Sequence, residues 1–245
     1  MKRKVGIIGY GWVAGANHKN SYAQAKDVEI VAVCDVNKAA LERAKRDYNL
    51  PDEALFDDYK KLIDSGLCDM VDICTPNYLH SIIAVEALNK GLHVFCEKPL
   101  TVNYELSCEM AEEARRQNKI VTIGVVNRYN KSVEMLEELN RQGRFGKIYH
   151  VYCSFRSFRS IPGLGGAFTN KAESGGGVLI DWGVHFFDLI LYILGGAKLE
   201  SCTCDAYSEM AKDMKAYKYT GMWAEDTKDI ENGTNDVDDY ITGYI

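Results

Sequence analysis

The 245-residue chain has no excess of positive charge, since 29 lysines and arginines stand against 35 aspartates and glutamates and the formal net charge is -6. Without a basic cluster it offers no electrostatic surface for phosphate backbones, so we expect no nucleic-acid partner. The apolar runs are strand-length and interrupted, which argues against a membrane span. No apolar signal region with a small-residue cleavage site follows Met1, so we expect a cytoplasmic protein.

The eight cysteines lack the spacing of a metal site or a disulfide framework. Cys202-x-Cys204 is too closely spaced for a zinc knuckle, and no second pair lies near it. Cys34, Cys74 and Cys96 lie in or at the end of apolar runs, where a free thiol behaves as a small hydrophobic group. We therefore expect reduced, buried thiols and no metal. Repeats and low-complexity segments are also absent from the sequence, and its size suits one large domain or two modest ones.

A glycine-rich turn follows the first apolar run. The segment that begins at Lys4 leads directly into Gly9-x-Gly11-x-x-Ala14. Gly9 permits a sharp turn, Gly11 lets the backbone approach a pyrophosphate, and Ala14 lets a helix lie close to the strand. The anion would face the positive end of that helix. A tight strand-to-helix turn without a ligand is the alternative, which the glycine pattern alone leaves open.

The second apolar run, residues 29–35, ends in Asp35, about 20 residues after the glycine turn, where a ribose-binding acid is expected. The carboxylate can accept hydrogen bonds from both hydroxyls of an adenine ribose and would repel a 2′-phosphate. NAD is therefore favoured over NADP as cofactor. Lys38 lies close enough to help hold a phosphate, and a solvated acid at a strand end is the alternative interpretation of Asp35.

Strand-like and helix-like segments alternate through the first half, which predicts a parallel sheet with helices on both faces. Ligands bind such sheets at the edge where the carboxyl ends of the strands meet. That edge would gather Gly9, Asp35, Thr75 to Asn77, Glu97 to Pro99 and Asn127 with Arg128. The predicted strands after the first are 29–35, 70–74, 93–96 and 120–125, and the predicted helices are 38–48, 59–65, 79–90 and 102–118.

The pattern changes after residue 128. An amphipathic helix at 132–142, an alternating strand at 148–155 and a helix at 181–194 are expected, followed by strands at 199–207 and 237–245. This mixture predicts a second, α+β domain built on an open, mostly antiparallel sheet. We expect the domains to be 1–127, which would bind the dinucleotide, and 128–245. The last strand would leave an unpaired sheet edge, so we expect further residues or a partner to cover it.

Four motifs, spanning residues 9 to 188, together resemble the glucose-fructose oxidoreductase / inositol dehydrogenase / MocA (Gfo/Idh/MocA) family of nicotinamide-dependent sugar and polyol dehydrogenases. The resemblance implies hydride transfer between a secondary alcohol of a sugar, cyclic polyol or sugar derivative and NAD, in a homodimer or homotetramer. Family members carry a larger C-terminal sheet, so the second domain is expected to be incomplete. The motifs are Gly9-x-Gly11-x-x-Ala14, Cys74-Thr75-Pro76-Asn77-x-x-His80, Glu97-Lys98-Pro99-Leu100 and Gly175-Gly176-Gly177-x-x-x-Asp181-x-Gly183-x-His185-x-x-Asp188.

Lys98 stands at the predicted end of a central strand, an unusual place for a solvated cation. Pro99 restricts the lysine's backbone and allows a cis peptide bond, which fixes where the side chain points. The family resemblance implies that Lys98 reaches the reacting hydroxyl and stabilises the developing alkoxide. A surface lysine before a helix-starting proline is the alternative.

Asp181 and His185 are four residues apart and so share one face of a helix, with Asp188 about one turn further. Histidine titrates near neutral pH and suits accepting the hydroxyl proton. The resemblance gives His185 that role and lets Asp181 orient the substrate or tune His185. Asp188 would support the helix or His185. An ion pair on a helix surface is the alternative for Asp181 and His185.

The remaining candidates follow from position and resemblance. Asn77 would lie along the nicotinamide ribose or cap the next helix, and His80 would be structural or contact the cofactor. In the second domain an arginine, Arg156 or Arg159, could pair with a substrate carboxylate. The complete cofactor set is Gly9, Gly11, Trp12, Val13, Asp35, Thr75, Pro76, Asn77, His80, Glu97, Lys98 and Asn127; the substrate set is Arg128, Tyr152, Arg156, Asp181 and His185; the catalytic set is Lys98, Asp181 and His185.

Two other functions are compatible with these residues. An NAD-dependent glycosidase or lyase would oxidise its substrate transiently to activate an adjacent position for elimination. A nucleotide or sugar sensor would use the same fold without chemistry, although such a protein has no need of a base.

Overall fold

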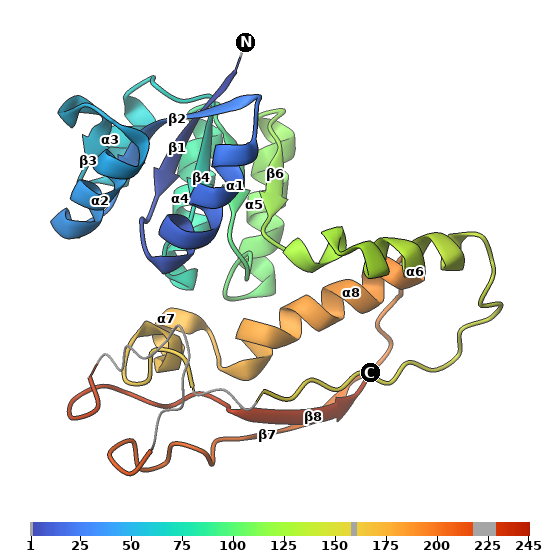
Figure 1. The fold of residues 1–245 in the computed structure, drawn as a ribbon. Coiled ribbons are helices and arrows are strands. Elements are labelled where there is room, and N and C mark those ends of the chain that lie inside the picture. Colours follow the sequence, from blue (N-terminus) through green and yellow to red (C-terminus); the bar gives the residue numbers. More distant parts are fainter. Residues whose placement is uncertain (1, 158–160, 218–228) are drawn as a thin grey trace. The chain divides into compact units, whose positions relative to one another are not determined.

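The computed structural model describes residues 2–157, 161–217 and 229–245. It divides into two compact units, Met1–Gly124 and Val125–Ile245 (Figure 1). Each unit has its own secondary structure and is described separately below.

The first unit contains the expected parallel sheet, with six strands in the order β3-β2-β1-β4-β5-β6. The short strand β3 was not predicted, because two residues show no periodicity. The ends of the central strands are level, since Ile8 is in register with Cys34 and Ile73, and Ile73 with Cys96. The strands are β1 (Arg3–Ile8), β2 (Val28–Cys34), β3 (Leu55–Phe56), β4 (Met70–Ile73), β5 (His93–Cys96) and β6 (Val121–Ile123).

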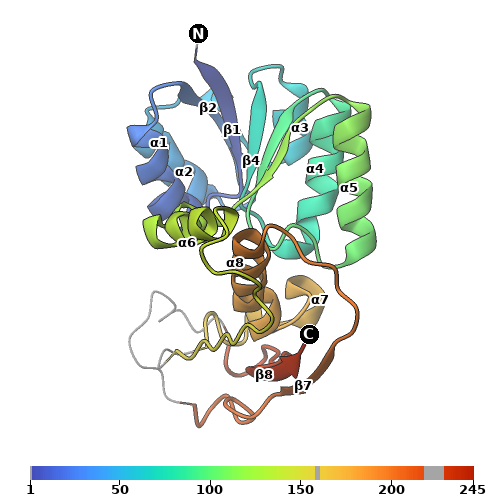
Figure 2. The same cartoon turned by 90° about the vertical axis from the view of Figure 1, so that its right-hand side faces the viewer.

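Helices cover both faces of this sheet, with α1 and α2 on one face and α3, α4 and α5 on the other (Figure 2). Each face has its own apolar core: Ile7 and Val33 pack with Ala40 and Ala44 of α2, whereas Ile73 belongs to the cluster on the opposite face. The helices are α1 (Lys19–Gln24), α2 (Lys38–Tyr48), α3 (Tyr59–Asp64), α4 (His80–Asn89) and α5 (Tyr104–Arg116).

Local capping chemistry sets where these helices begin. The side chains of Asn37 and Asn103 accept backbone N–H groups at the starts of α2 and α5. Asn77 does not have the expected place directly before α4, because a 3₁₀ turn, Asn77–Leu79, intervenes and α4 begins at His80. Between the glycine turn and α1, residues Ala14–His18 form a π-helical turn.

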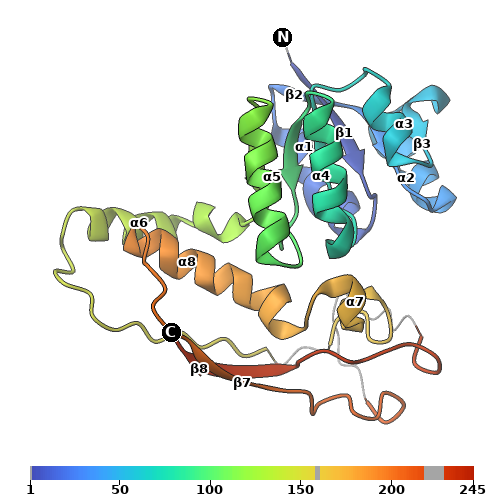
Figure 3. The same ribbon diagram turned by 180° about the vertical axis from the view of Figure 1, so that it is seen from behind.

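The second unit is built from the helices α6 (Lys131–Arg141), α7 (Lys171–Ser174) and α8 (Val184–Leu194) and the antiparallel strands β7 (Thr203–Tyr207) and β8 (Tyr240–Tyr244). Helices α6 and α8 lie side by side (Figures 1 and 3), and the Asn140 side chain donates a hydrogen bond to the Ile193 carbonyl. A π-helical turn, Leu179–Gly183, leads into α8.

The strand predicted at 148–155 is wrong, since these described residues form no regular secondary structure. Their alternating pattern suits a half-buried strand, but a strand also needs a neighbour to receive its backbone hydrogen bonds. Strands β7 and β8 pair with each other instead, and both are shorter than the segments predicted for them.

The expectation that no segment is long and apolar enough to cross a membrane also needs correction. The helical stretch Lys171–Leu194 has 24 residues and a mean hydropathy of 1.6, which meets both criteria by length and composition. Within it, Gly175 to Gly177 separate α7 from the π-helical turn that leads into α8. Core helices of soluble proteins meet the same criteria, so these two properties do not assign a membrane span.

Candidate active site

The glycine turn has the geometry expected of a dinucleotide loop. Gly9 has a φ of +91°, and a Cβ placed on it would lie 2.7 Å from the Cys74 carbonyl oxygen, so the turn has no room for a side chain there. A Cβ on Gly11 would meet nothing within 4 Å, which leaves open space beside its backbone. Trp12 and Val13 begin the helix immediately after this turn. The turn can therefore admit a phosphate close to the main chain, as NAD requires.

Asp35 lies against this turn at the end of β2. Its Oδ2 accepts the Tyr10 N–H at 2.6 Å and its Oδ1 accepts the Asn37 N–H at 2.7 Å. A carboxylate has about four acceptor sites, so each oxygen keeps a lone pair for a ribose hydroxyl. The side chain thus fixes the loop and still fits the predicted ribose contact.

Arg43 is a further residue beside the turn that the sequence interpretation missed. It donates to the Tyr10 carbonyl, and its guanidinium carbon lies 5.3 Å from the centre of the Tyr10 ring. Arg43 belongs to α2, the helix that begins directly after Asp35 and Asn37. Its position in this helix places it beside the glycine turn. The charge of Arg43 is therefore directed to the loop backbone.

The segment after β4 supplies an orphaned polar group. The Thr75 hydroxyl is buried and has no hydrogen-bond partner among the described residues. It lies next to the glycine turn, because a Cβ on Gly9 would be 3.0 Å from the Thr75 backbone nitrogen. An unpaired buried hydroxyl is costly, and a bound cofactor could satisfy it.

His80 is buried, and its ring bridges two backbone segments. Its Nδ1 lies 2.7 Å from the Pro99 carbonyl oxygen and its Nε2 lies 2.9 Å from the Thr75 carbonyl oxygen. Burial lowers the pKa of His80. The hydrogen bonds to the two carbonyl oxygens favour the protonated ring, but their effect is smaller than that of burial. The side chain joins the segments after β4 and β5, in agreement with its structural interpretation.

The Glu97-Lys98-Pro99 segment follows β5 at the same edge, and the Lys98-Pro99 bond is cis. Glu97 turns its carboxylate inward: Oε1 lies 2.9 Å from His18 Nε2 and Oε2 accepts the Lys98 N–H at 3.1 Å. A Cβ on Gly124 would lie 2.8 Å from Glu97 Oε1, so the glycine makes room for this carboxylate.

A buried charge network missed by the sequence interpretation lies behind this segment. Asp72 is 0% exposed and accepts from His18 Nδ1 at 2.7 Å and from the Tyr22 hydroxyl at 2.9 Å. Burial of His18 opposes its charge, but hydrogen bonds to Asp72 and Glu97 raise its pKa to about 10. Burial likewise opposes ionisation of Glu97, and the bond from His18 nevertheless lowers the pKa of this carboxyl. The signal in the sequence was Asp72 itself, an acid inside an apolar strand.

In the second unit, Asp181 lies in the π-helical turn before α8 and His185 in the first turn of α8. His185 is buried, and its ring centre lies 5.9 Å from that of Trp182, which stacks on Phe155. The shared helical segment was predicted. Asp181 and His185 therefore lie on consecutive helical segments, four residues apart.

Arg128 and Asp188 form an ion pair in the second unit. The guanidinium donates through both Nε, at 2.7 Å, and Nη2 to the two carboxylate oxygens of Asp188. Its carbon also lies 5.1 Å from the centre of the Tyr192 ring. Asp188 thus connects α8 to the 3₁₀ turn that carries Arg128, and much of the charge of Arg128 is already paired.

The remaining candidates are Asn127, expected to contact the cofactor, and Tyr152 and the arginines of the same segment, expected to contact the substrate. Asn127 is in a 3₁₀ turn, Val126–Tyr129. Tyr152 is 81% exposed, and Arg156 is exposed in a segment without regular structure. Arg159 lies outside the described residues.

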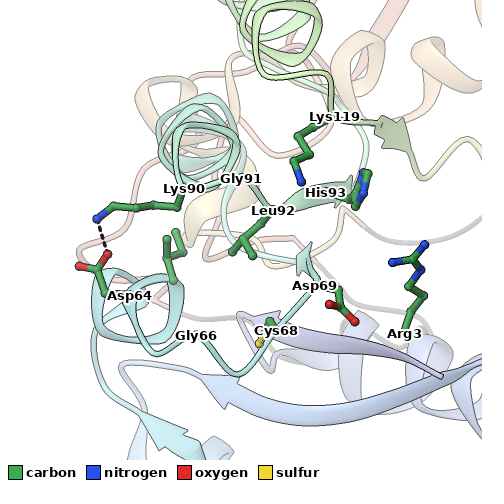
Figure 4. Close-up of a pocket in the computed structure, with 11 residues that line it drawn as sticks. Arg3, Asp64, Gly66, Cys68, Asp69, Lys90, Gly91, Leu92, His93 and Lys119 are labelled. Carbon is green, nitrogen blue, oxygen red and sulfur yellow. Dashed lines mark ion pairs between the residues drawn. The ribbon is translucent and has the colours of Figure 1, made fainter. Parts of the chain in front are cut away.

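A pocket of about 470 Å³ opens at the other edge of the first unit's sheet, where the strands begin (Figure 4). Arg3, Asp69, His93 and Lys119 line it, and a Lys90–Asp64 ion pair of 2.6 Å closes one side. The pocket is thus separated by the length of the strands from Gly9 and Asp35, and it is not part of the candidate cofactor site.

The fold of the first unit, its glycine turn and the carboxylate after β2 define a Rossmann-fold protein that binds a dinucleotide. A family model described as an oxidoreductase family with an NAD-binding Rossmann fold matches residues 3–125, and the GFO/IDH/MocA C-terminal domain matches residues 133–245. The chain therefore belongs to the Gfo/Idh/MocA family of oxidoreductases, as the motifs indicated.

Individual relatives agree with this membership. D-glucoside 3-dehydrogenase of Escherichia coli K12 is 30% identical over 242 residues, which cover 99% of this chain and 68% of that protein. Inositol 2-dehydrogenase of Salmonella paratyphi B is 36% identical over 139 residues, covering 56% of this chain and 40% of that protein. A levoglucosan dehydrogenase solved with NADH and levoglucosan shares the fold, with a TM-score of 0.77 and 23% identity over 99% of this chain and 63% of that chain. This chain thus spans about two thirds or less of these proteins.

Proposed function

We propose that the protein is an NAD-dependent dehydrogenase that transfers hydride between a secondary alcohol of a sugar, cyclic polyol or sugar derivative and nicotinamide. The observation that carries this proposal is the position of Lys98, directly after β5, at the sheet edge that also holds the glycine turn and Asp35. The names of the relatives support the substrate class, since they include a glucoside dehydrogenase and an inositol dehydrogenase.

In this proposal the chain's own residues hold and deprotonate the reacting hydroxyl. Lys98 donates a hydrogen bond to its oxygen and stabilises the alkoxide that develops. His185 accepts the proton, and Asp181 orients the substrate or His185. NAD, when bound, supplies the acceptor for the hydride.

The cofactor contacts proposed for the first unit follow from the geometry of the turn. Gly9 and Gly11 would admit the pyrophosphate, Asp35 would bind the adenine ribose, and the buried Thr75 hydroxyl would find its partner on the nicotinamide side. Asp35 would also repel a 2′-phosphate, so we propose NAD rather than NADP as the physiological cofactor. No group among the described residues is proposed to bind a metal.

We also propose a cytoplasmic homodimer or homotetramer. The sheet of β7 and β8 supports self-association, because it has only these two strands among the described residues, and open strand edges are suited to pairing with another chain. The net charge of -6 supports small-molecule rather than nucleic-acid partners. Light scattering of the purified protein over a range of concentrations would measure the mass, and a strictly monomeric protein would contradict the assembly proposed.

The activity is tested by incubating the purified protein with NAD or NADP and a panel of methyl glucosides, free aldoses, sugar acids and inositols. We expect NADH to accumulate with at least one of these alcohols and faster than NADPH. Protein that binds NADH but forms none from the whole panel would contradict a net dehydrogenase. Release of an aglycone without net NADH would instead identify the elimination reaction, and binding without either product would identify a sensor.

A further inference from the structure

The Glu97 carboxylate is positioned to hold the backbone of Lys98. Oε2 accepts the Lys98 N–H at 3.1 Å, and the Glu97 N–H is bound to the Ile73 carbonyl oxygen at 2.9 Å. The Glu97 side chain is 14% exposed and occupies the space that a Cβ on Gly124 would take. This carboxylate therefore faces the protein interior and holds the segment that carries Lys98.

His18 holds the other oxygen of the same carboxylate. Its Nε2 donates to Glu97 Oε1 at 2.9 Å, while its Nδ1 donates to Asp72 Oδ2 at 2.7 Å. Because both ring nitrogens face carboxylate oxygens, the geometry requires two N–H donors and hence the imidazolium form. The titratable groups around the ring are Asp72 and Cys74 from the segment of β4, Glu97 after β5 and Tyr22 from α1, with the Phe95 ring centre 5.7 Å away.

The location of His18 in the chain gives this contact a consequence. His18 ends the π-helical turn Ala14–His18, which belongs to the helical segment that starts directly after the glycine turn. One side chain that is 11% exposed therefore joins the helix expected to face the pyrophosphate to the segment that carries the proposed catalytic lysine. A displacement of either segment would break a bond between opposite charges in a buried site, which is costly.

We propose that His18 is a positioning residue for the reaction: anchored on Asp72, it clamps the Glu97 carboxylate and so fixes the backbone from which Lys98 extends toward the substrate. This inference rests on the catalytic role proposed for Lys98. A small displacement of a catalytic group lowers turnover strongly, because the reacting atoms must be held within a fraction of an ångström.

The same cluster includes side-chain types that bind zinc, but its geometry favours the charge clamp. His18, Asp72 and Cys74 have ligand atoms within 4.8 Å of one another. Two ligands of a tetrahedral zinc, each at about 2.0–2.1 Å, would be about 3.3 Å apart. His18 Nδ1 and Asp72 Oδ2 are 2.7 Å apart, the distance of a direct charged hydrogen bond.

The test compares the His18→Gln variant with Tyr22→Phe. Tyr22→Phe is the matched control, because it removes a hydrogen bond to the same Asp72 carboxylate and leaves the His18–Glu97 contact in place. We expect His18→Gln to lower kcat by about 10- to 100-fold with NAD affinity changed less than about threefold, and Tyr22→Phe to stay near wild type. In a Lys98→Ala background, His18→Gln should cause no further loss, since the residue it positions is gone. An equal loss of kcat in both backgrounds would overturn the proposal.

A second readout does not depend on activity. The rate at which an acylating reagent labels Lys98 is measured by mass spectrometry, with the 90% exposed Lys131 of the second unit as internal reference. We expect labelling of Lys98 relative to Lys131 to change at least about threefold in His18→Gln and to stay constant in Tyr22→Phe. An unchanged labelling ratio overturns the positioning role of His18. This readout remains valid if the wild-type protein is inactive on every sugar, because inactivity refutes only the proposed function.

Glu97→Gln provides a second variant if His18→Gln does not fold. It removes the negative charge with little change of shape, so we expect the same change in Lys98 labelling, and the double variant should be no worse than either single one. Additive effects of the two substitutions would show that His18 and Glu97 act independently, against the proposal.

Discussion

Raising the pH from about 6.5 to about 10 should destabilise the first unit through a single side chain, His18. The pKa of His18 is raised from 6.5 to about 10 in the folded protein, because its bonds to Asp72 and Glu97 outweigh the cost of burying it. Between these two values the folded chain holds a proton that the unfolded chain has lost. The free energy of unfolding must then fall as the pH rises.

The magnitude follows from the shift. One pKa unit corresponds to 1.36 kcal/mol, so the proton on His18 contributes about 5 kcal/mol, as an order of magnitude, to the free energy of unfolding. This contribution is fully present below about pH 6.5 and is lost as the pH passes through about 10. Glu97 acts in the opposite direction: its pKa is lowered, so its contribution is present above its unfolded value of 4.5 and is lost as the pH falls through the lower, folded value.

The assay is urea unfolding followed by circular dichroism, at several pH values from about 6 to about 10, on wild-type protein and His18→Gln. Titrating groups outside this cluster affect both proteins equally, so the difference between the two reports the His18 proton and the carboxylates paired with it. We expect this difference in unfolding free energy to be largest near pH 6.5 and to shrink by several kcal/mol toward pH 10. Parallel curves for the two proteins would refute a buried imidazolium.

Three substitutions test the site itself. Lys98→Ala should leave the dissociation constant of NAD, measured by calorimetry, nearly unchanged while kcat falls by about two to four orders of magnitude; unchanged turnover would remove Lys98 from the mechanism. Asp35→Ala should lower the ratio of kcat/KM for NAD over NADP by about tenfold or more, and an equal ratio would show that another group contacts the ribose. Gly9→Ala should lower the free energy of unfolding by about 1–3 kcal/mol and weaken NAD binding, because the new Cβ would lie 2.7 Å from the Cys74 carbonyl oxygen. A urea unfolding midpoint of the variant equal to that of the wild type would contradict this.

The parts of the first unit that follow from local chemistry were predictable from the sequence. Apolar runs separated by helical patterns predicted the parallel sheet, and the spacing of Gly9 and Asp35 marked both as candidate cofactor residues. Both lie directly after strands whose last residues are level, so the motif and the sheet geometry agree. The cis bond after Lys98, which Pro99 allows, is present.

The contacts that join distant segments were not predictable. His18 is separated from Asp72 by 54 residues and from Glu97 by 79, and no local pattern connects them. The strand expected at 148–155 failed for a related reason, since alternation shows which face is apolar but not whether a neighbouring strand exists. The pairing of Arg128 with Asp188 likewise depends on the packing of α8 in the second unit.

The central claim is that Lys98 and His185 act on the same hydroxyl of a sugar held against nicotinamide. A crystal structure of the protein with NADH and a bound sugar or inositol measures this directly, through the distances from the reacting oxygen to Lys98 Nζ and to the nearer ring nitrogen of His185. We predict that both are about 3 Å. A complex in which the two side chains lie on opposite sides of the bound sugar, with only one of them near its reacting carbon, would contradict the proposed reaction.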